Sequence, residues 1–192
     1  MKEKRVCGAC SECCVILEDD DRPAFTPCRN LRTEGRGCEH YDRRPRTCQL
    51  FCCTWLSGHT RPADRPDISG VLAHITLNRY AEEIALNVVE CRPDAFAQQR
   101  ELVDSYKAAD VCCVMFVYHD GRRSIYSKDQ RFINILREGN ACLAGIPRDV
   151  KVLEAMLAPD SICSSSASDV GSPIVTTPVR KRGKQRATAR PR

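Results

Sequence analysis

The sequence lacks any long apolar run. No stretch approaches the ~20 apolar residues that a transmembrane helix needs. The basic start, MKEKRVCGAC, is not followed by the apolar segment of a secretory signal. We therefore expect no membrane-spanning segment and a cytoplasmic protein, in a compartment where thiols stay reduced.

The sequence also lacks the common catalytic signatures. It shows no glycine-rich dinucleotide loop, no phosphate loop, no Ser/His/Asp set and no carboxylate pair. The Cys-x3-Cys-x2-Cys pattern of radical-SAM enzymes is absent as well. No residue pattern therefore identifies a substrate or a reaction.

Cysteine, in contrast, is abundant and unevenly distributed. The chain of 192 residues has 14 cysteines, and nine of them lie between Cys7 and Cys53. In a reducing compartment, such a cluster indicates metal binding or thiol chemistry before it indicates disulfides.

The spacing of the first cysteines favours a metal site. Cys7, Cys10 and Cys13 are three residues apart, and Cys14 follows directly. A Cys-x-x-Cys turn brings two sulfurs to one side, so three such thiols can hold zinc or a cluster if a further ligand comes from elsewhere. Further thiols follow at Cys28, Cys38, Cys48 and Cys53. Soft thiolate ligands suit zinc and iron–sulfur clusters about equally well.

Three segments together resemble the bacterial CxxCxxCC cysteine-cluster family, the YkgJ-like zinc- or iron-chelating domain. They are CGACSECC, then Pro27-Cys28 with Leu31, then GCEHYDRRPRTCQLFCCTW. The resemblance covers residues 5–56 and is specific in its order and spacing. It implies a metal centre, either an iron–sulfur cluster or Zn2+, and some members are labelled iron–sulfur oxidoreductases.

The resemblance also implies a ligand set. Its metal-binding cysteines correspond to Cys7, Cys10, Cys13, Cys14, Cys28, Cys38, Cys48 and Cys53. Other marked positions of the family correspond to Tyr41, Arg44, Pro45 and Phe51. Two departures leave the ligand pattern intact: Cys52 stands at a variable position, and Gln49 stands where the family often has Arg.

The composition divides the chain into three parts. Residues 1–60 have poor apolar periodicity, so we expect a loop-dominated metal-binding module that depends on its metal for stability. The stretch 61–67, RPADRPD, reads as a linker or turn that opens an α+β body over residues 61–163. Residues 164–192 are rich in Ser, Pro, Thr and basic residues, which predicts disorder.

Within the body, β-branched runs predict strands at 71–77, 84–89 and 111–119, with a return strand at 122–126 after a two-residue turn at Asp120-Gly121. We expect antiparallel pairs with a helix from Pro93-Asp94 to about residue 109 between them. Ser127 and Gln130 have capping-box spacing and predict another helix, ending at Gly139. Pro147, with Val150, Leu153 and Leu157 at helical spacing, predicts a last one.

The remaining cysteines and the histidines have plainer interpretations. Cys112 and Cys113 are expected in a strand, where they would point to opposite faces as small buried hydrophobes. Cys91 and Cys142 are interpreted similarly, and Cys163 as an exposed thiol. His40 and His59 flank the cluster and are alternative ligands, although surface positions are favoured. Basic side chains beside the cluster are expected to offset thiolate charge: Arg36, Arg43, Arg44 and Arg46.

Two alternative functions remain open. Residues 164–192 carry seven Lys/Arg and one acid, a formal +6, so the rest of the chain is −1 out of the total of +5. In the first alternative, the protein is a zinc-stapled binding module, and its basic tail at 180–192 engages nucleic acid or an acidic protein. The other alternative is a metal-free redox sensor in which Cys13-Cys14 and Cys52-Cys53 oxidise.

Overall fold

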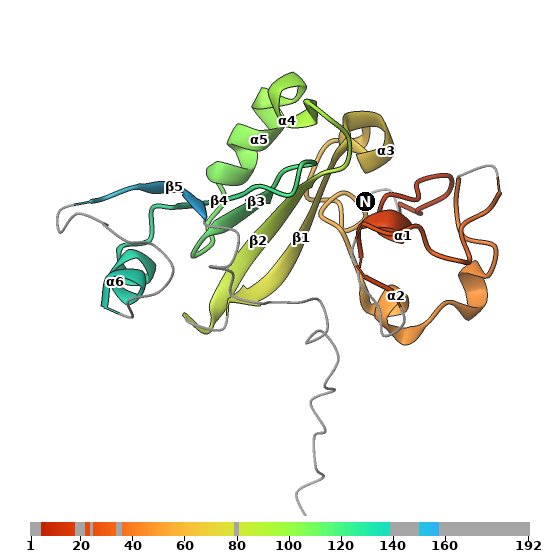
Figure 1. Cartoon of the computed structure of the whole chain (residues 1–192), viewed down its shortest axis with the longest axis horizontal. Helices are drawn as coiled ribbons and strands as arrows, with labels where there is room; N and C mark the ends of the chain where they lie inside the picture. Colours follow the sequence, from red (N-terminus) through yellow and green to blue (C-terminus); the bar gives the residue numbers. More distant parts are fainter. Residues whose placement is uncertain are drawn as a thin grey trace, which may run out of the picture.

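A mixed β-sheet forms the centre of the molecule. The structure is a computed structural model that describes residues 5–17, 22–23, 25–33, 36–78, 81–138 and 150–157. Its described part contains a five-stranded sheet with the strands side by side in chain order (Figure 1). They are β1 (Val71–Asn78), β2 (Glu83–Glu90), β3 (Val114–Val117), β4 (Arg123–Ser127) and β5 (Leu153–Leu157). A sheet combined with helices agrees with the expected α+β body.

The strand pairing is mixed, whereas the sequence predicted antiparallel pairs. β1 pairs antiparallel with β2, and β3 with β4, but β2 and β3 are parallel. The parallel pair follows from the long crossover between them, which contains α4 (Ala95–Gln98) and α5 (Arg100–Lys107). The β3–β4 loop also differs, because the Tyr118 N–H donates to the carbonyl of Arg122 and leaves three residues in the loop.

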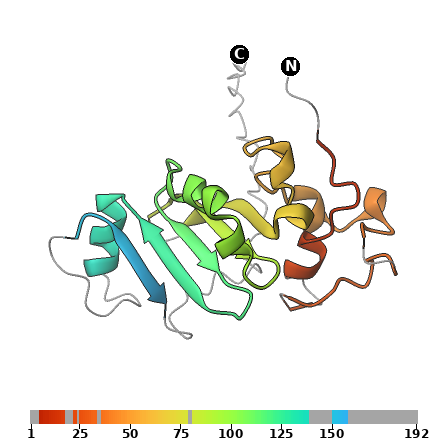
Figure 2. The ribbon, with the colours of Figure 1, turned by 90° about the horizontal axis from the view of Figure 1, so that it is seen from above.

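The two faces of the sheet are covered by different elements. Helices α4 and α5 cover one face, where Phe96, Leu102 and Tyr106 pack on Val88 and Phe116. On the other face, α6 (Gln130–Glu138) lies toward β5 and the cysteine-rich N-terminal segment lies toward β1 (Figures 1 and 2). The N-terminal segment therefore rests on a sheet face as its platform.

Helix α6 begins at a different cap from the predicted one. Asp129 is its N-cap residue, because its carboxylate accepts the N–H of Arg131 at 2.8 Å. Ser127 instead belongs to β4 and donates its hydroxyl to the carbonyl of Cys112. The predicted burial of Phe132, Ile133 and Leu136 is confirmed, while Gly139 lies outside the described residues.

A strand replaces the helix predicted after Pro147. Residues 153–157 form β5, which pairs antiparallel with β4. The spacing of Leu153 and Leu157 misled the prediction, because residues four apart share a face in a strand as well as in a helix. Leu153, Ala155 and Leu157 all pack into the core beneath α6. Pro147 itself lies outside the described residues.

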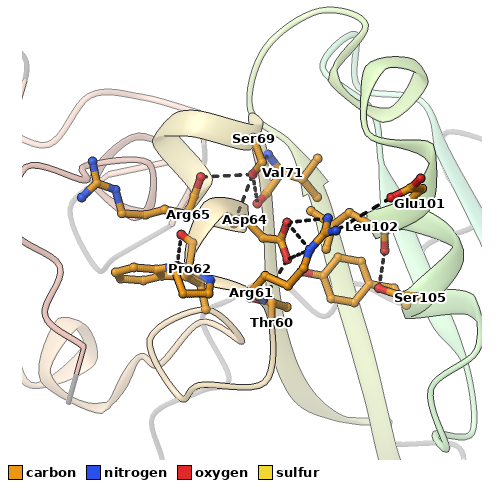
Figure 3. A network of polar contacts seen from close by, with 12 residues as sticks. Thr60, Arg61, Pro62, Asp64, Arg65, Ser69, Val71, Glu101, Leu102 and Ser105 are labelled. Carbon is orange, nitrogen blue, oxygen red and sulfur yellow. Dashed lines mark hydrogen bonds and ion pairs between the residues drawn. The ribbon is translucent and has the colours of Figure 1, made fainter. Parts of the chain in front are cut away.

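The expected linker at 61–67 is a packed junction between the N-terminal segment and the sheet. It contains η2 (Pro62–Asp64) and leads into α3 (Pro66–Ser69). The Asp64 carboxylate is buried, and it accepts the Arg61 backbone N–H at 2.8 Å and its guanidinium at 3.0 Å (Figure 3). Ser69 is buried beside it and bonds to the backbone of Val71 at the start of β1. These contacts order the junction that leads into β1.

The N-terminal segment has little regular structure, as its composition predicted. Its helical turns are α1 (Cys13–Ile16), η1 (Tyr41–Arg43) and α2 (Arg46–Leu50). Ile16, Cys53 and Trp55 pack against Leu72 and Val89 of the sheet. No helix in the described ranges is long and apolar enough to cross a membrane. The tail at 164–192 lies outside those ranges.

The cap of α6 can be tested directly. Asp129→Ala should lower the free energy of unfolding by about 1 kcal/mol, because it removes the acceptor for the first turn. Gln130→Ala is the matched control, since its side chain bonds to Asn134 within the same helix and its loss should cost less than about 0.5 kcal/mol. Urea unfolding of both variants measures the difference. A larger loss for Gln130→Ala would instead support the capping box predicted from sequence.

Candidate metal centre

All eight predicted ligand cysteines line one cavity in the N-terminal segment. The space in the cavity that a water-sized sphere can reach is about 60 Å3. The cysteines around it are Cys7, Cys10, Cys13, Cys14, Cys28, Cys38, Cys48 and Cys53. The other cysteines in the described residues, Cys52, Cys91, Cys112 and Cys113, are not part of its lining.

Short turns bring the first five of these thiols together. Cys10 donates its N–H to the carbonyl of Cys7 at 2.9 Å, which closes the Cys-x-x-Cys turn. α1 then carries Cys13 and Cys14. The next thiol is brought back to this helix by a backbone bond of 2.8 Å, from the N–H of Cys28 to the carbonyl of Cys14.

A small hairpin-like ladder positions Cys38. Its backbone pairs antiparallel with Leu31, flanked by bonds from Arg32 to Gly37 and from Glu39 to Asn30. Gly37 is buried with a φ of 78°, and a Cβ at this position would stand 3.1 Å from the carbonyl oxygen of Gly8. A side chain here would require this oxygen to move by a few tenths of an ångström, and the positive φ also favours glycine where the Cys7–Cys10 loop approaches the Cys38 loop.

Cys53 ties the cavity to the sheet. Its backbone forms a bridge with His74 on β1, and the next N–H, of Thr54, donates to the carbonyl of Ala73 at 2.8 Å. The Thr54 hydroxyl also bonds to the Tyr106 hydroxyl of α5 at 3.1 Å. Movement of this thiol is therefore restrained by contacts with both layers of the α+β body.

Several sulfurs accept backbone N–H groups. Asn30 donates to Cys28 Sγ at 3.5 Å, and Leu56 donates to Cys53 Sγ at 3.4 Å. The N–H groups of Glu12 and Asp67 likewise bond to Cys10. Hydrogen bonds to sulfur stabilise a thiolate and tune the metal that it binds.

Two arginines add positive charge to the cavity wall. Arg22 and Arg44 both line it, and Arg22 Nη1 donates to the carbonyl of Cys14 at 2.7 Å. The pKa of Cys14 is lowered to about 7, because Cys13 donates to its sulfur and both arginines attract its negative charge. The same hydrogen bond, with burial, raises the pKa of Cys13. The wall therefore favours negative charge at Cys14.

Burial acts in the opposite direction at two other thiols. It raises the pKa of Cys10 to about 11, and it also raises the pKa of Cys53. A coordinating thiol is deprotonated outright by the charge of a bound metal ion. Metal binding at these residues would therefore release protons, as it does in thiolate sites generally.

The donor set fits a soft metal in kind, since all eight candidate ligands are thiols. Eight thiols converge on one cavity that also supplies N–H donors and two cations. In the described part of the chain, however, no three His, Cys, Asp or Glu side chains are already grouped as ligands of one ion. Coordination would therefore require the cysteine side chains to rotate further into the cavity.

The two histidines predicted as alternative ligands lie outside the cavity. His40 and His59 are both exposed and do not line the cavity. Of the four arginines expected beside the cluster, only Arg44 lines the cavity, while Arg36, Arg43 and Arg46 are exposed. Cys52 is exposed, and its thiol donates to the carbonyl of Cys53.

The two adjacent cysteines of the α+β body do not point to opposite faces of a strand, as the sequence predicted. Cys112 and Cys113 are buried as expected, but they precede β3 and their sulfurs are 3.8 Å apart. They pack in the same core, beneath α6, because the pleat of the strand has not yet begun there. Cys142 and Cys163 lie outside the described residues.

Sequence reasoning missed several residues around the cavity. Arg22 and Asn30 line it, and no spacing rule could have placed them there. Trp55, the single tryptophan of the chain, also lines the cavity. The guanidinium carbons of Arg5 and Arg65 lie 5.2 Å and 6.0 Å from its ring centroid. Its fluorescence is therefore a local reporter of this region.

Comparisons with models of protein families, with curated proteins and with solved structures gave no match. The resemblance to the CxxCxxCC family therefore stays a prediction from the motif.

The tight contact at Gly37 gives a test of the cavity's construction. Gly37→Ala should lower the free energy of unfolding by clearly more than the control Gly121→Ala. Gly121 has a similar φ of 83°, but no atom lies within 4 Å of the position that a Cβ would take there. The control carries only the left-handed strain of order 1–3 kcal/mol. Urea unfolding followed by Trp55 fluorescence reports the affected segment. An equal loss of unfolding free energy in both variants would show that the contact with Gly8 does not affect stability.

Proposed function

We propose that this is a cytosolic metal-binding protein that holds an iron–sulfur cluster or zinc through its N-terminal cysteines. The observation that carries the proposal is selective convergence. Eight cysteines from several separate turns of chain line one cavity, while the other cysteines in the described residues lie outside it. Reduced structural thiols have no reason to gather in this way.

The surroundings of the cavity suit thiolate ligation. Four thiolates on one Zn2+ leave two negative charges, and a thiolate-ligated cluster is also negative. Arg22 and Arg44 face that charge from the cavity wall. The N–H groups of Asn30 and Leu56 stabilise individual sulfurs in addition. These residues would hold a negatively charged centre at low cost in free energy.

We favour an iron–sulfur cluster slightly over zinc. A bound cluster would supply electron transfer or redox catalysis, with hydrogen bonds to the sulfurs setting its potential. This would make the protein an iron–sulfur oxidoreductase. With zinc, eight thiols leave no open ligand position, so the site would stabilise the fold. Both options rest on the same eight residues.

Cysteine substitutions test the ligand set. In full-length protein purified without oxygen, Cys10→Ser and Cys13→Ser should each lower the metal content by at least half. The Trp55 emission should shift at the same time, because the segment loses its cross-link. Cys52→Ser is the matched control, since its thiol is exposed and lies outside the cavity lining. Equal metal content in all three variants would refute the assignment.

A further inference from the structure

The last strand of the sheet, β5, has one side without a partner in the described part of the chain. The strands lie side by side in chain order, so β5 is the outermost strand, drawn in blue in Figures 1 and 2. Its other side pairs with β4 from Leu153 to Leu157. Proteins usually protect such an edge, because its backbone N–H and C=O groups can pair with another strand. The outer side of β5 is therefore a place where one more strand can bind.

The strand register shows which backbone groups of β5 point outward. The Tyr118 N–H donates to the Arg122 carbonyl at 2.9 Å, so the backbone groups of Arg122 point toward the β3 side. Because these directions alternate along an antiparallel strand, the groups of Ile125 point toward β5, where Ile125 pairs with the central residue. The two residues that flank this central residue, Glu154 and Met156, then direct their N–H and C=O groups away from β4. They offer two donors and two acceptors to an additional strand.

The side chains along this edge do not repel another strand. Met156 and Val152, which lies just before β5, are 51% and 49% exposed. Glu154 is the acidic residue of β5, and its carboxylate is ion-paired with Lys107 of α5 at 2.9 Å. The charge of Glu154 is therefore offset within the molecule. Uncompensated charges are one means by which native edges avoid pairing, and β5 does not carry one.

One short run of the chain beyond the described residues suits this edge. The composition of 164–192 as a whole predicts disorder, but residues 174–177, IVTT, are all β-branched. Pro173 and Pro178 stand on either side of the run and limit a strand to about its length, because proline cannot donate to a strand ladder. The run is uncharged and close in length to the five residues of β5.

The connection to this run is long enough for pairing within one chain. β5 ends at Leu157, and the 16 residues of 158–173 lie between it and the run. An extended chain of that length spans up to roughly 53 Å, whereas a five-residue strand is only about 17 Å long. The run can therefore reach β5 in either direction. Consecutive strands of a chain also tend to lie side by side.

We propose that residues 174–177 form one more strand, which pairs with the outer edge of β5 in the same chain. The pairing satisfies the outward backbone groups of Glu154 and Met156, and it places a β-branched side chain beside Met156. It protects the edge from pairing with other molecules. It also anchors the nearby basic segment, 180–192, to this side of the sheet. This inference goes beyond the proposed function and does not depend on bound metal.

Hydrogen exchange of single backbone amides, followed by NMR in the full-length protein, tests the pairing. The double variant Ile174→Pro/Val175→Pro removes two adjacent N–H groups, one of which faces β5 in either register. The N–H groups of Glu154 and Met156, the outward amides, should then exchange at least about tenfold faster than in wild type, because their partner strand is lost. The Ala155 N–H points toward β4 and should keep its rate, which shows that the sheet is intact.

A second double variant is the matched control. Ser165→Pro/Ser166→Pro adds two prolines to the connection and should leave the outward amides unchanged. Cross-strand NOEs between 174–177 and β5 should appear in wild type and in this control only. Equal exchange of the outward amides in wild type and Ile174→Pro/Val175→Pro would overturn the inference. Protection that rises with protein concentration would assign the edge to a second copy and overturn it as well. Neither result bears on metal binding, so the proposed function is tested separately.

Discussion

The N-terminal segment has too few buried apolar side chains to hold its own shape. Among its described residues, only Ile16, Cys53 and Trp55 belong to the buried hydrophobic core. Ordering each backbone residue costs roughly 1–2 kcal/mol, and three buried side chains recover only a small part of that total. A cross-link would offset this cost, and the metal proposed to bind the eight thiols around the cavity would supply one.

The α+β body acts as a platform for the cavity. Its β1 strand pairs with the chain at Cys53, and its α5 helix bonds to Thr54 through Tyr106. The buried Asp64 and Ser69 order the junction that leads into β1 (Figure 3). One end of the predicted ligand set, Cys53, is thus attached to the sheet.

Much of the fold was readable from sequence wherever local chemistry decides the structure. The strand pair at 71–78 and 83–90 and the buried face of α6 follow from β-branched runs and helical spacing. Three features depended on tertiary contacts instead. The parallel β2–β3 pair arises from a crossover, β5 is a strand because it pairs with β4, and the 61–67 segment is ordered by the buried Asp64.

The candidate site likewise has residues that the sequence predicted and residues that only the fold reveals. The spacing of the cysteines indicated which thiols to group, and the structure places that group around one cavity. The spacing did not indicate Arg22, Asn30 or Trp55, because these residues reach the cavity only through the folded path of the chain. It also misjudged Cys112 and Cys113, whose directions depend on where β3 begins. Sequence thus identified the ligand candidates, and the fold identified the residues that surround them.

The central claim is that the eight thiols of this cavity hold metal. The most direct measurement is the amount of iron, zinc and acid-labile sulfide in one sample of full-length protein purified without oxygen, with its mass measured under native conditions. The account predicts stoichiometric metal: either iron with matching sulfide and a brown colour, or zinc in a colourless protein. Protein that is folded, free of metal and unable to take up iron or zinc would contradict it.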